Sequence, residues 1–162
     1  MKVARVTLSD RAANGVYEDL SGPEIERVVQ DLFATEIEWH RAVLPDERAL
    51  LENALRKFAD EETCPLIITT GGTGPGARDV TPEATRAVLE KELPGFGEIM
   101  RMRSFENVPT AILSRATAGI RGRSLIVNLP GRPRAIAECL PLLREAIVEC
   151  VDHLTNFRPT LR

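Results

Sequence analysis

The sequence contains few of the residues on which metal, redox and nucleic-acid chemistry commonly depends. Aromatic residues make up 4% of its 162 positions and the formal net charge is −3, which argues against a nucleic-acid-binding surface. The three cysteines lack the spacing of a metal site or a redox motif. His40 and His153 have no partners at the spacing of metal ligands or of a catalytic triad, so we expect structural roles for them.

Long apolar runs are also missing. No stretch is long and apolar enough to cross a bilayer, and Arg5, Asp10 and Arg11 interrupt the apolar run at the N-terminus, unlike an export signal. An odd number of cysteines without such a signal is typical of a reducing compartment. We therefore expect a cytoplasmic protein that binds neither membranes nor nucleic acid.

Basic residues, in contrast, are concentrated in one segment of the chain. Between Arg101 and Arg134 there are seven arginines and one acidic residue, Glu106, so this segment carries +6. The remainder has 14 basic and 23 acidic residues, or −9. A cationic segment on an acidic protein favours a small polyanionic ligand. We expect about half of these arginines to pair with acidic residues from elsewhere in the fold or from a neighbouring subunit.

Hydrophobic patterning predicts strands that alternate with helices. Apolar runs predict strands at 3–8, 37–43, 66–70 and 125–128, and apolar residues at helical spacing predict helices beginning near 21, 46, 81, 96 and 133. Asp46 and Thr81 are the predicted N-caps of their helices. The segment 109–114 is ambiguous between strand and helix.

The most informative stretch is residues 69–79, Thr-Thr-Gly-Gly-Thr-Gly-Pro-Gly-Ala-Arg-Asp. A predicted buried strand ends in this glycine loop, whose backbone N–H groups could close on an anion such as phosphate. Arg78 and Asp79 are suited to bind phosphate oxygens and a metal ion. The alternative is a turn that only reverses the chain, but the glycines, threonines and Arg-Asp pair exceed what a turn requires.

Common nucleotide-binding and nucleophile motifs do not match this loop. A Walker A loop needs a Lys-Ser or Lys-Thr pair after its last glycine, where this chain has Ala77-Arg78-Asp79. A dinucleotide fingerprint needs a glycine at the position of Ala77 and an acidic residue downstream for the ribose. No serine lies in a nucleophile elbow.

The order of elements predicts an α/β fold, with a single domain over residues 1–155 and a loose polar tail at 156–162. We expect three layers, a mostly parallel sheet with helices on both faces. In such a sheet every strand-to-helix loop emerges at the carboxyl edge, where ligands bind. Asp10, Asp46 and Asp79 should therefore meet at the glycine loop although they are far apart in sequence.

These features together closely resemble the Mog family of molybdopterin-binding proteins, specifically the molybdopterin adenylyltransferases of molybdenum-cofactor biosynthesis. The resemblance extends over nearly the entire chain. The matching segments are 9–12 (Ser-Asp-Arg-Ala), 15–19 (Gly-Val-Tyr-Glu-Asp), 45–47 (Pro-Asp-Glu), 70–75 (Thr-Gly-Gly-Thr-Gly-Pro), 78–83 (Arg-Asp-Val-Thr-Pro-Glu), 93–98 (Leu-Pro-Gly-Phe-Gly-Glu), 109–115 (Pro-Thr-Ala-Ile-Leu-Ser-Arg) and 128–131 (Asn-Leu-Pro-Gly).

The resemblance implies a homotrimeric enzyme that transfers AMP from ATP to the terminal phosphate of molybdopterin with Mg²⁺, releasing pyrophosphate. It implies catalytic and metal-binding roles for Asp46 and Asp79, and the molybdate-insertion enzyme as a partner. The residues that it assigns to nucleotide or pterin binding are Ser9, Asp10, Arg11, Thr70, Gly71, Gly72, Thr73, Gly74, Arg78, Ser114, Arg115, Pro130 and Gly131.

The implied chemistry suits these residue types. A phosphate monoester with a second pKa of about 6 is already an anionic nucleophile near neutral pH, so no general base is required. The difficulty lies in bringing two polyanions together, which backbone amides, arginines and a divalent cation on Asp46 and Asp79 would relieve.

Two alternatives stay open at this point. From the residue pattern alone, a plain helix cap and a metal ligand are about equally good interpretations of Asp46. Capping does not exclude metal binding. The protein as a whole is either an adenylyltransferase or a non-catalytic carrier of the pterin. A molybdate-inserting enzyme is less well supported because the chain has no second domain.

Overall fold

A computed structural model describes all 162 residues. It has a six-stranded sheet with the strand order β2-β1-β3-β6-β5-β4. The elements in chain order are β1 (Lys2–Leu8), α1 (Asp10–Ala13), α2 (Ser21–Leu32), β2 (Glu38–Leu44), α3 (Arg48–Arg56), a π-helical turn η1 (Lys57–Glu61), β3 (Leu66–Thr70), α4 (Thr81–Val88), β4 (Lys91–Glu92), α5 (Gly95–Phe105), a 3₁₀ turn η2 (Pro109–Leu113), β5 (Ala118–Arg121), β6 (Ser124–Leu129) and α6 (Pro133–Thr155).

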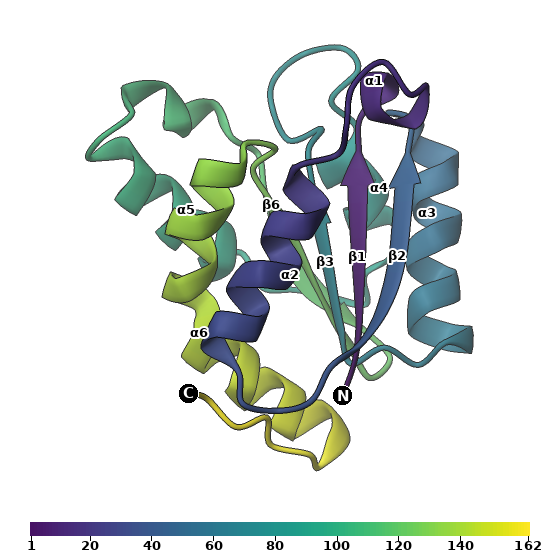
Figure 1. Ribbon diagram of the computed structural model, residues 1–162, viewed down its shortest axis with the longest axis vertical. Coiled ribbons are helices and arrows are strands. Elements are labelled where there is room, and N and C mark those ends of the chain that lie inside the picture. The colour runs from purple at the N-terminus through teal and green to yellow at the C-terminus, as the bar shows by residue number, and fades with distance from the viewer.

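The sheet is mostly parallel and lies between two layers of helices (Figure 1). Strands β2, β1, β3 and β6 pair in parallel, whereas β5 is antiparallel to β6 and β4 is antiparallel to β5. Helices α2 and α6 cover one face of the sheet, and α3 and α4 cover the other. The predicted three-layer α/β fold is confirmed. No helix is long and apolar enough to span a membrane.

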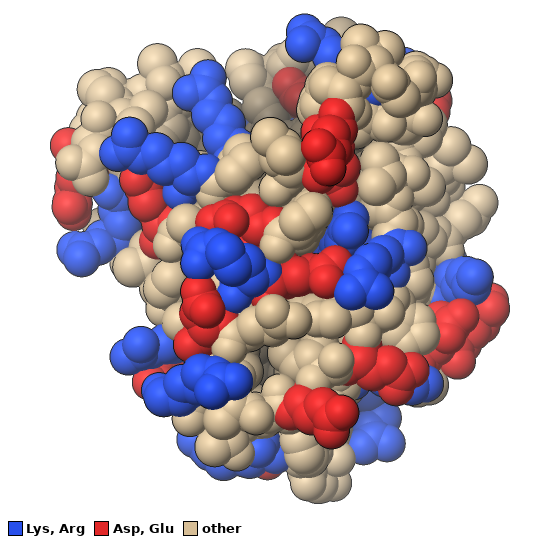
Figure 2. All heavy atoms as spheres, viewed as in Figure 1, with Lys and Arg blue, Asp and Glu red and all other residues tan.

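On the face covered by α2 and α6, acidic and basic side chains lie side by side (Figure 2). Arg27 on α2, for example, pairs with Glu24 and Asp31 on the same helix. The same view shows the upper rim of the molecule hollowed between the α5 side and the loop that contains α1. This rim is the carboxyl end of the parallel strands.

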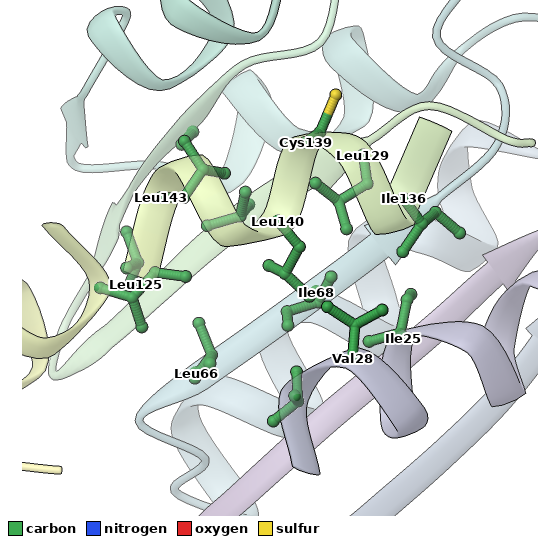
Figure 3. Close-up of a cluster of buried hydrophobic side chains, with 14 of the residues drawn as sticks. Ile25, Val28, Leu66, Ile68, Leu125, Leu129, Ile136, Cys139, Leu140 and Leu143 are labelled. Carbon is green, nitrogen blue, oxygen red and sulfur yellow. The ribbon is translucent and has the colours of Figure 1, made fainter. Parts of the chain in front are cut away.

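The hydrophobic core consists of two clusters, one on each face of the sheet. Because successive residues of a strand point to opposite faces, Ile68 packs with α2 and α6 while Ile67 packs with α3 and α4, and both are fully buried. Figure 3 shows the larger cluster, in which Ile25 and Leu140 approach the sheet from their helices. Burial on both faces explains the continuous apolar run of β3, whose five residues are all buried.

The order of the strands reverses at β1, because the chain passes from β1 to β2 on one side and then to β3 on the other. Ligands of open α/β sheets bind where the loops diverge at such a point. Gly71, directly after β3, has a φ of +91°, and a Cβ there would overlap the carbonyl oxygen of Leu8 at the end of β1. The glycine loop therefore lies directly against the end of the neighbouring strand.

The structure corrects both predicted helix caps. Helix α3 begins at Arg48 with Glu47 as its N-cap, because the Asp46 carboxylate accepts a hydrogen bond from another loop. Thr81 is the first residue of α4, not its N-cap, and its hydroxyl donates to the carbonyl oxygen of Gly71. Both side chains serve the loops at the rim instead of their own helices.

The prediction missed two short strands and misjudged the tail. Strands β4 and β5 are two and four residues long, too short to show alternation, and the ambiguous segment 109–114 is a 3₁₀ turn. The tail after α6 is not loose. Leu161 forms a β-bridge with Phe33, the Ala34 N–H donates to Thr160, and Pro159 is buried, so the last residues close over the end of α2.

Candidate functional site

The loops after β1 and β2 are joined by a reciprocal pair of hydrogen bonds. The Asp10 N–H donates to Oδ2 of Asp46 at 3.0 Å, and the Asp46 N–H donates to Oδ1 of Asp10 at 2.9 Å. Asp10 is the first residue of α1, whose N-cap is Ser9. The predicted convergence of these loops at one edge is confirmed, and the two carboxylates lie close together as a result.

Arg78 connects the glycine loop to this pair. Its guanidinium donates to both carboxylate oxygens of Asp10, at 3.0 and 2.8 Å, and to Glu47 at 3.1 Å. These bonds hold the pKa of Asp10 below its ordinary value and raise that of Arg78, because each charge stabilises the other. Arg78 was expected to bind phosphate. In the structure it binds carboxylates, and its side chain is 59% exposed.

Asp46 and Asp79 flank the same short stretch of glycine loop. A Cβ on Gly72 would lie 3.2 Å from Oδ1 of Asp46, and a Cβ on Gly74 would lie 2.9 Å from Oδ2 of Asp79. Glycine at positions 72 and 74 therefore keeps side chains off both carboxylates. The Asp79 carboxylate also accepts the N–H of Gly76 at 2.8 Å. The loop-closing hydrogen bond that was the alternative role for Asp79 is therefore present.

The pKa of Asp46 is raised above its ordinary value of 3.8. Partial burial is the main cause, and the negative charges of Asp10 and Asp79 add to it, although the Asp10 N–H works in the opposite direction. An acidic group held in this way gains from any nearby cation. The site therefore has a carboxylate that its surroundings make costly to ionise.

Arg115 holds the glycine loop through several hydrogen bonds. Its guanidinium donates to the carbonyl oxygens of Gly74 at 2.9 Å and of Asp79 at 2.7 Å, and to the Glu83 carboxylate on α4. Its backbone N–H donates to Thr73. Partial burial disfavours ionisation of Glu83, but the bond to Arg115, a backbone hydrogen bond and the charges of Arg115 and Arg86 together lower the pKa of this carboxyl. One side chain thus fixes both ends of the loop.

A pocket of about 470 Å³ opens beside the glycine loop. Residues from the glycine loop, α5, η2, the turn at 130–131 and the start of α6 line it. Its charged lining residues are Arg101, Arg132, Arg134 and Glu138, so the pocket is cationic on balance. A second hollow of about 440 Å³ lies on the other side of the loop, where Asp79, Arg48 and Arg115 line it.

Comparison with known proteins gives a consistent picture. A model of a probable molybdopterin binding domain matches residues 4–149. The chain belongs to this family. It is 56% identical over 147 residues to a molybdopterin adenylyltransferase of Helicobacter pylori strain J99, which covers 91% of this chain and 84% of the relative.

Other relatives extend the comparison. A molybdopterin adenylyltransferase of Escherichia coli K12 is 46% identical over 153 residues, covering 94% of this chain and 78% of the relative. The crystal structure of the molybdopterin biosynthesis enzyme MoaB from Thermus thermophilus superposes with a TM-score of 0.89 at 38% identity, covering 97% of this chain and 98% of that chain.

In this molybdopterin-binding domain, the residues singled out from the sequence fall into two neighbouring groups. One group surrounds the Asp10–Asp46 pair and the glycine loop. The other lines the cationic pocket. The first comprises Ser9, Asp10, Asp46, Gly71, Gly72, Arg78 and Asp79, and the second comprises Thr73, Gly74, Ser114, Pro130 and Gly131.

Three predicted site residues belong to neither group, and binding roles for them stay predictions. Thr70 is buried, and its hydroxyl donates to the carbonyl oxygen of Pro130 at 2.7 Å. Arg115 is occupied by the loop itself. Arg11 is exposed on α1, and no contact brings it into the site.

Fewer arginines of the cationic segment than expected pair with acidic residues from elsewhere in the fold. Arg115 and Arg121 pair with Glu83 and Asp60. Arg103 and Arg134 pair only with Glu106 and Glu138, three and four residues along the chain. Arg101 and Arg123 instead donate to backbone carbonyl oxygens. Arg132 and Arg134 could not be predicted as pocket-lining residues, because only the folding of η2 and α5 against the start of α6 creates that pocket. The only sign of a cationic pocket in the sequence was the number of arginines between residues 101 and 134.

Proposed function

We propose that this protein is a molybdopterin adenylyltransferase of molybdenum-cofactor biosynthesis. It transfers AMP from ATP to the terminal phosphate of molybdopterin and releases pyrophosphate. The observation that carries the proposal is the placement of Asp46 and Asp79 against one bare stretch of glycine loop beside a cationic pocket. Relatives named as molybdopterin adenylyltransferases, at 56% and 46% identity, support it.

The reaction requires little acid–base chemistry from the protein. A phosphate oxygen of molybdopterin attacks the α-phosphorus of ATP, the bond from that phosphorus to the bridging oxygen breaks, and pyrophosphate leaves with the electron pair. The attacking phosphate is ionised near neutral pH. Backbone N–H groups of the glycine loop and arginines of the pocket hold the two polyanions together and stabilise the charge that builds up between them.

We propose Mg²⁺ as the cation of this site, with Asp46 and Asp79 as its protein ligands. Their oxygens are of the type that Mg²⁺ prefers, and the raised pKa of Asp46 indicates negative charge that a cation would relieve. No group of three or more His, Cys, Asp or Glu side chains could hold a metal ion by itself. That fits Mg²⁺, which commonly binds one or two carboxylates together with substrate phosphates. Bound there, it would neutralise phosphate charge.

We also propose that the protein is a cytoplasmic homotrimer. Supporting an assembly, α5 and η2 expose Met102 and Ile112 at 68% and 63%, together with Phe105 and Leu113 at 48% and 54%. Such a concentration of exposed apolar residues is typical of an interface. A molybdate-insertion enzyme is the partner that would consume the product.

The decisive experiment combines the protein with ATP, MgCl₂ and molybdopterin and measures pyrophosphate release. We expect release that depends on all three components. Asp79→Asn should lower turnover by at least about 100-fold while molybdopterin binding changes little, as expected for a group that acts on the transition state. Pterin binding without any pyrophosphate from the wild-type protein would instead identify a carrier.

A further inference from the structure

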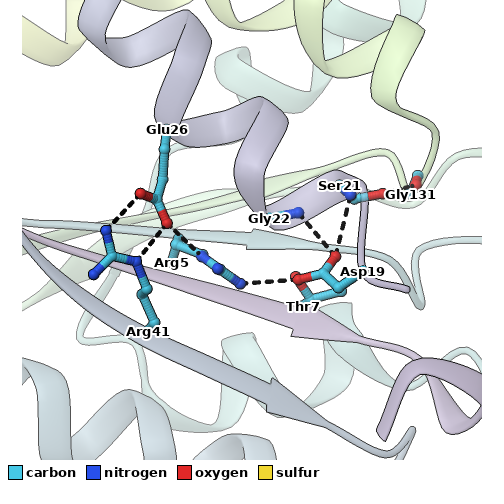
Figure 4. Close-up of polar contacts among 8 residues, drawn as sticks. All are labelled: Arg5, Thr7, Asp19, Ser21, Gly22, Glu26, Arg41 and Gly131. Atoms are coloured by element: carbon cyan, nitrogen blue, oxygen red, sulfur yellow. Dashed lines mark hydrogen bonds and ion pairs between the residues drawn. The ribbon is translucent and has the colours of Figure 1, made fainter. Parts of the chain in front are cut away.

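A buried polar cluster lies behind the site, between β1 and α2 (Figure 4). Arg5 and Thr7 project from the same face of β1, and both donate to Oδ2 of Asp19 at 2.9 Å. The side chains of Arg5 and Asp19 are only 10% and 13% exposed. Because burying such an ion pair is often no more favourable than apolar packing, stability alone does not account for the cluster.

The second oxygen of Asp19 fixes the beginning of α2. Oδ1 accepts the N–H groups of Ser21 at 3.1 Å and Gly22 at 2.9 Å. A side chain at position 22 would push the Arg5 guanidinium away from Asp19, since a Cβ there would overlap Nη1 of Arg5 and Oδ2 of Asp19. Through Asp19, the side chains of Arg5 and Thr7 on β1 thus determine the position of Ser21, the first residue of α2.

Ser21 in turn holds the turn at Pro130–Gly131. Its hydroxyl donates to the carbonyl oxygen of Gly131 at 2.7 Å. The hydroxyl of Thr70 donates to the carbonyl oxygen of Pro130. Two successive carbonyl groups are therefore tied to two different elements, α2 and β3. The turn lines the cationic pocket, and a Cβ on Gly131 would lie 3.2 Å from the Cα of Gly71.

We propose that Asp19 and Ser21 are positioning residues for the pocket, acting through the Pro130–Gly131 turn. This inference rests on the proposed function, because it assigns a role in the same reaction. Asp19 holds Ser21, and Ser21 fixes Gly131 between the pocket and the glycine loop. Without the Ser21 hydroxyl the turn loses one of the two side-chain hydrogen bonds that hold it. Because the turn lines the pocket, the substrate in the pocket then binds less tightly. The carboxylates on the other side of the glycine loop stay in place.

Ser21→Ala tests the inference, with Ser21→Thr as the conservative variant that keeps the hydroxyl. Glu26→Gln is the matched control. Glu26 bonds to Arg5 and Arg41 in the same cluster but does not contact Ser21. We expect Ser21→Ala to raise the KM of one substrate roughly 3- to 10-fold, the effect of one lost hydrogen bond, with kcat and the other KM unchanged. Ser21→Thr should restore wild-type values, and Glu26→Gln should lower only the melting temperature.

A merely structural role would give a different pattern. Loss of folded enzyme would lower kcat in proportion to stability and leave both KM values alone. That result, or wild-type kinetics for Ser21→Ala, overturns the inference. If the wild-type protein releases no pyrophosphate, the proposed function fails separately. The dissociation constants for molybdopterin and for ATP then decide: a rise in one of them for Ser21→Ala supports the positioning role, and no rise in either overturns it.

Discussion

Asp10 and Asp46, 36 residues apart, each accept a hydrogen bond from the backbone N–H of the other. The two carboxyl groups nevertheless respond to the fold in opposite directions. The bonds from Arg78 lower the pKa of Asp10, whereas burial raises the pKa of Asp46. The reciprocal hydrogen bonds thus place the Asp10 carboxylate, whose ionised form is stabilised, beside the Asp46 carboxylate, whose ionised form is destabilised.

This asymmetry predicts opposite effects of two amide substitutions on stability. The raised pKa of Asp46 means that its ionisation cost is absent below pH 3.8 and grows as the pH rises through the folded-state pKa. Asp46→Asn should therefore stabilise the metal-free protein at pH 7, because it removes the cost of ionising a partly buried carboxyl. The difference should vanish toward about pH 3.

Asp10→Asn provides the matched comparison. Its lowered pKa contributes stability that is present above the ordinary value of 3.8 and is lost as the pH falls through the folded-state pKa. This variant should be less stable than the wild type at pH 7 and equal to it in strong acid. Thermal melts in EDTA across this pH range measure both. Shifts of the same sign for the two variants would contradict the electrostatic account.

Arg115→Lys should loosen the glycine loop, because an ammonium group cannot reach the three acceptors that the planar guanidinium holds together. We expect the unfolding free energy to fall by about 2 kcal/mol. We also expect kcat to fall, because the glycine loop that holds the substrates is no longer fixed. Arg103→Lys is the control, since its pair with Glu106 is 3.6 Å long and exposed. Denaturant titration that found the two variants equally stable would remove the loop-holding role of Arg115.

Gly71→Ala should be far more damaging than Gly122→Ala. Both positions have a positive φ, +91° and +54°, but nothing lies within 4 Å of a Cβ on Gly122, whereas a Cβ on Gly71 overlaps Leu8. The strained backbone alone costs about 1 kcal/mol, and the overlap should raise the cost at Gly71 to at least about 3 kcal/mol. Equal unfolding free energies would show that the loop can move away from β1.

Met102→Lys should weaken self-association, because it places a charge on the exposed apolar surface of α5 and η2. We expect the wild-type protein to sediment as a trimer and the variant as smaller species. Leu50→Lys, on α3 at 46% exposure, is the control and should leave the mass unchanged. A monomeric wild-type protein would remove the proposal of a trimer.

Particular residues show how far sequence reasoning reached. The bounds of β3 were predicted correctly, since five buried apolar and threonine residues followed by glycines permit few other structures. The convergence of Asp10, Asp46 and the glycine loop followed from the rule that parallel strands end at one edge. Asp46 and Thr81 were wrong as N-caps, because local patterns do not show that a side chain has a better partner in another loop.

The α/β fold and the edge at which the site forms could be inferred from the order of the amino acids, because hydrophobic periodicity and loop chemistry are local properties. How each charge is used could be seen only in the folded protein. The fold assigned Arg115 to the loop and Arg78 to Asp10, and it joined Arg5 through Asp19 and Ser21 to Gly131. Such choices depend on distances between groups far apart in the chain, and those distances exist only after the layers have packed.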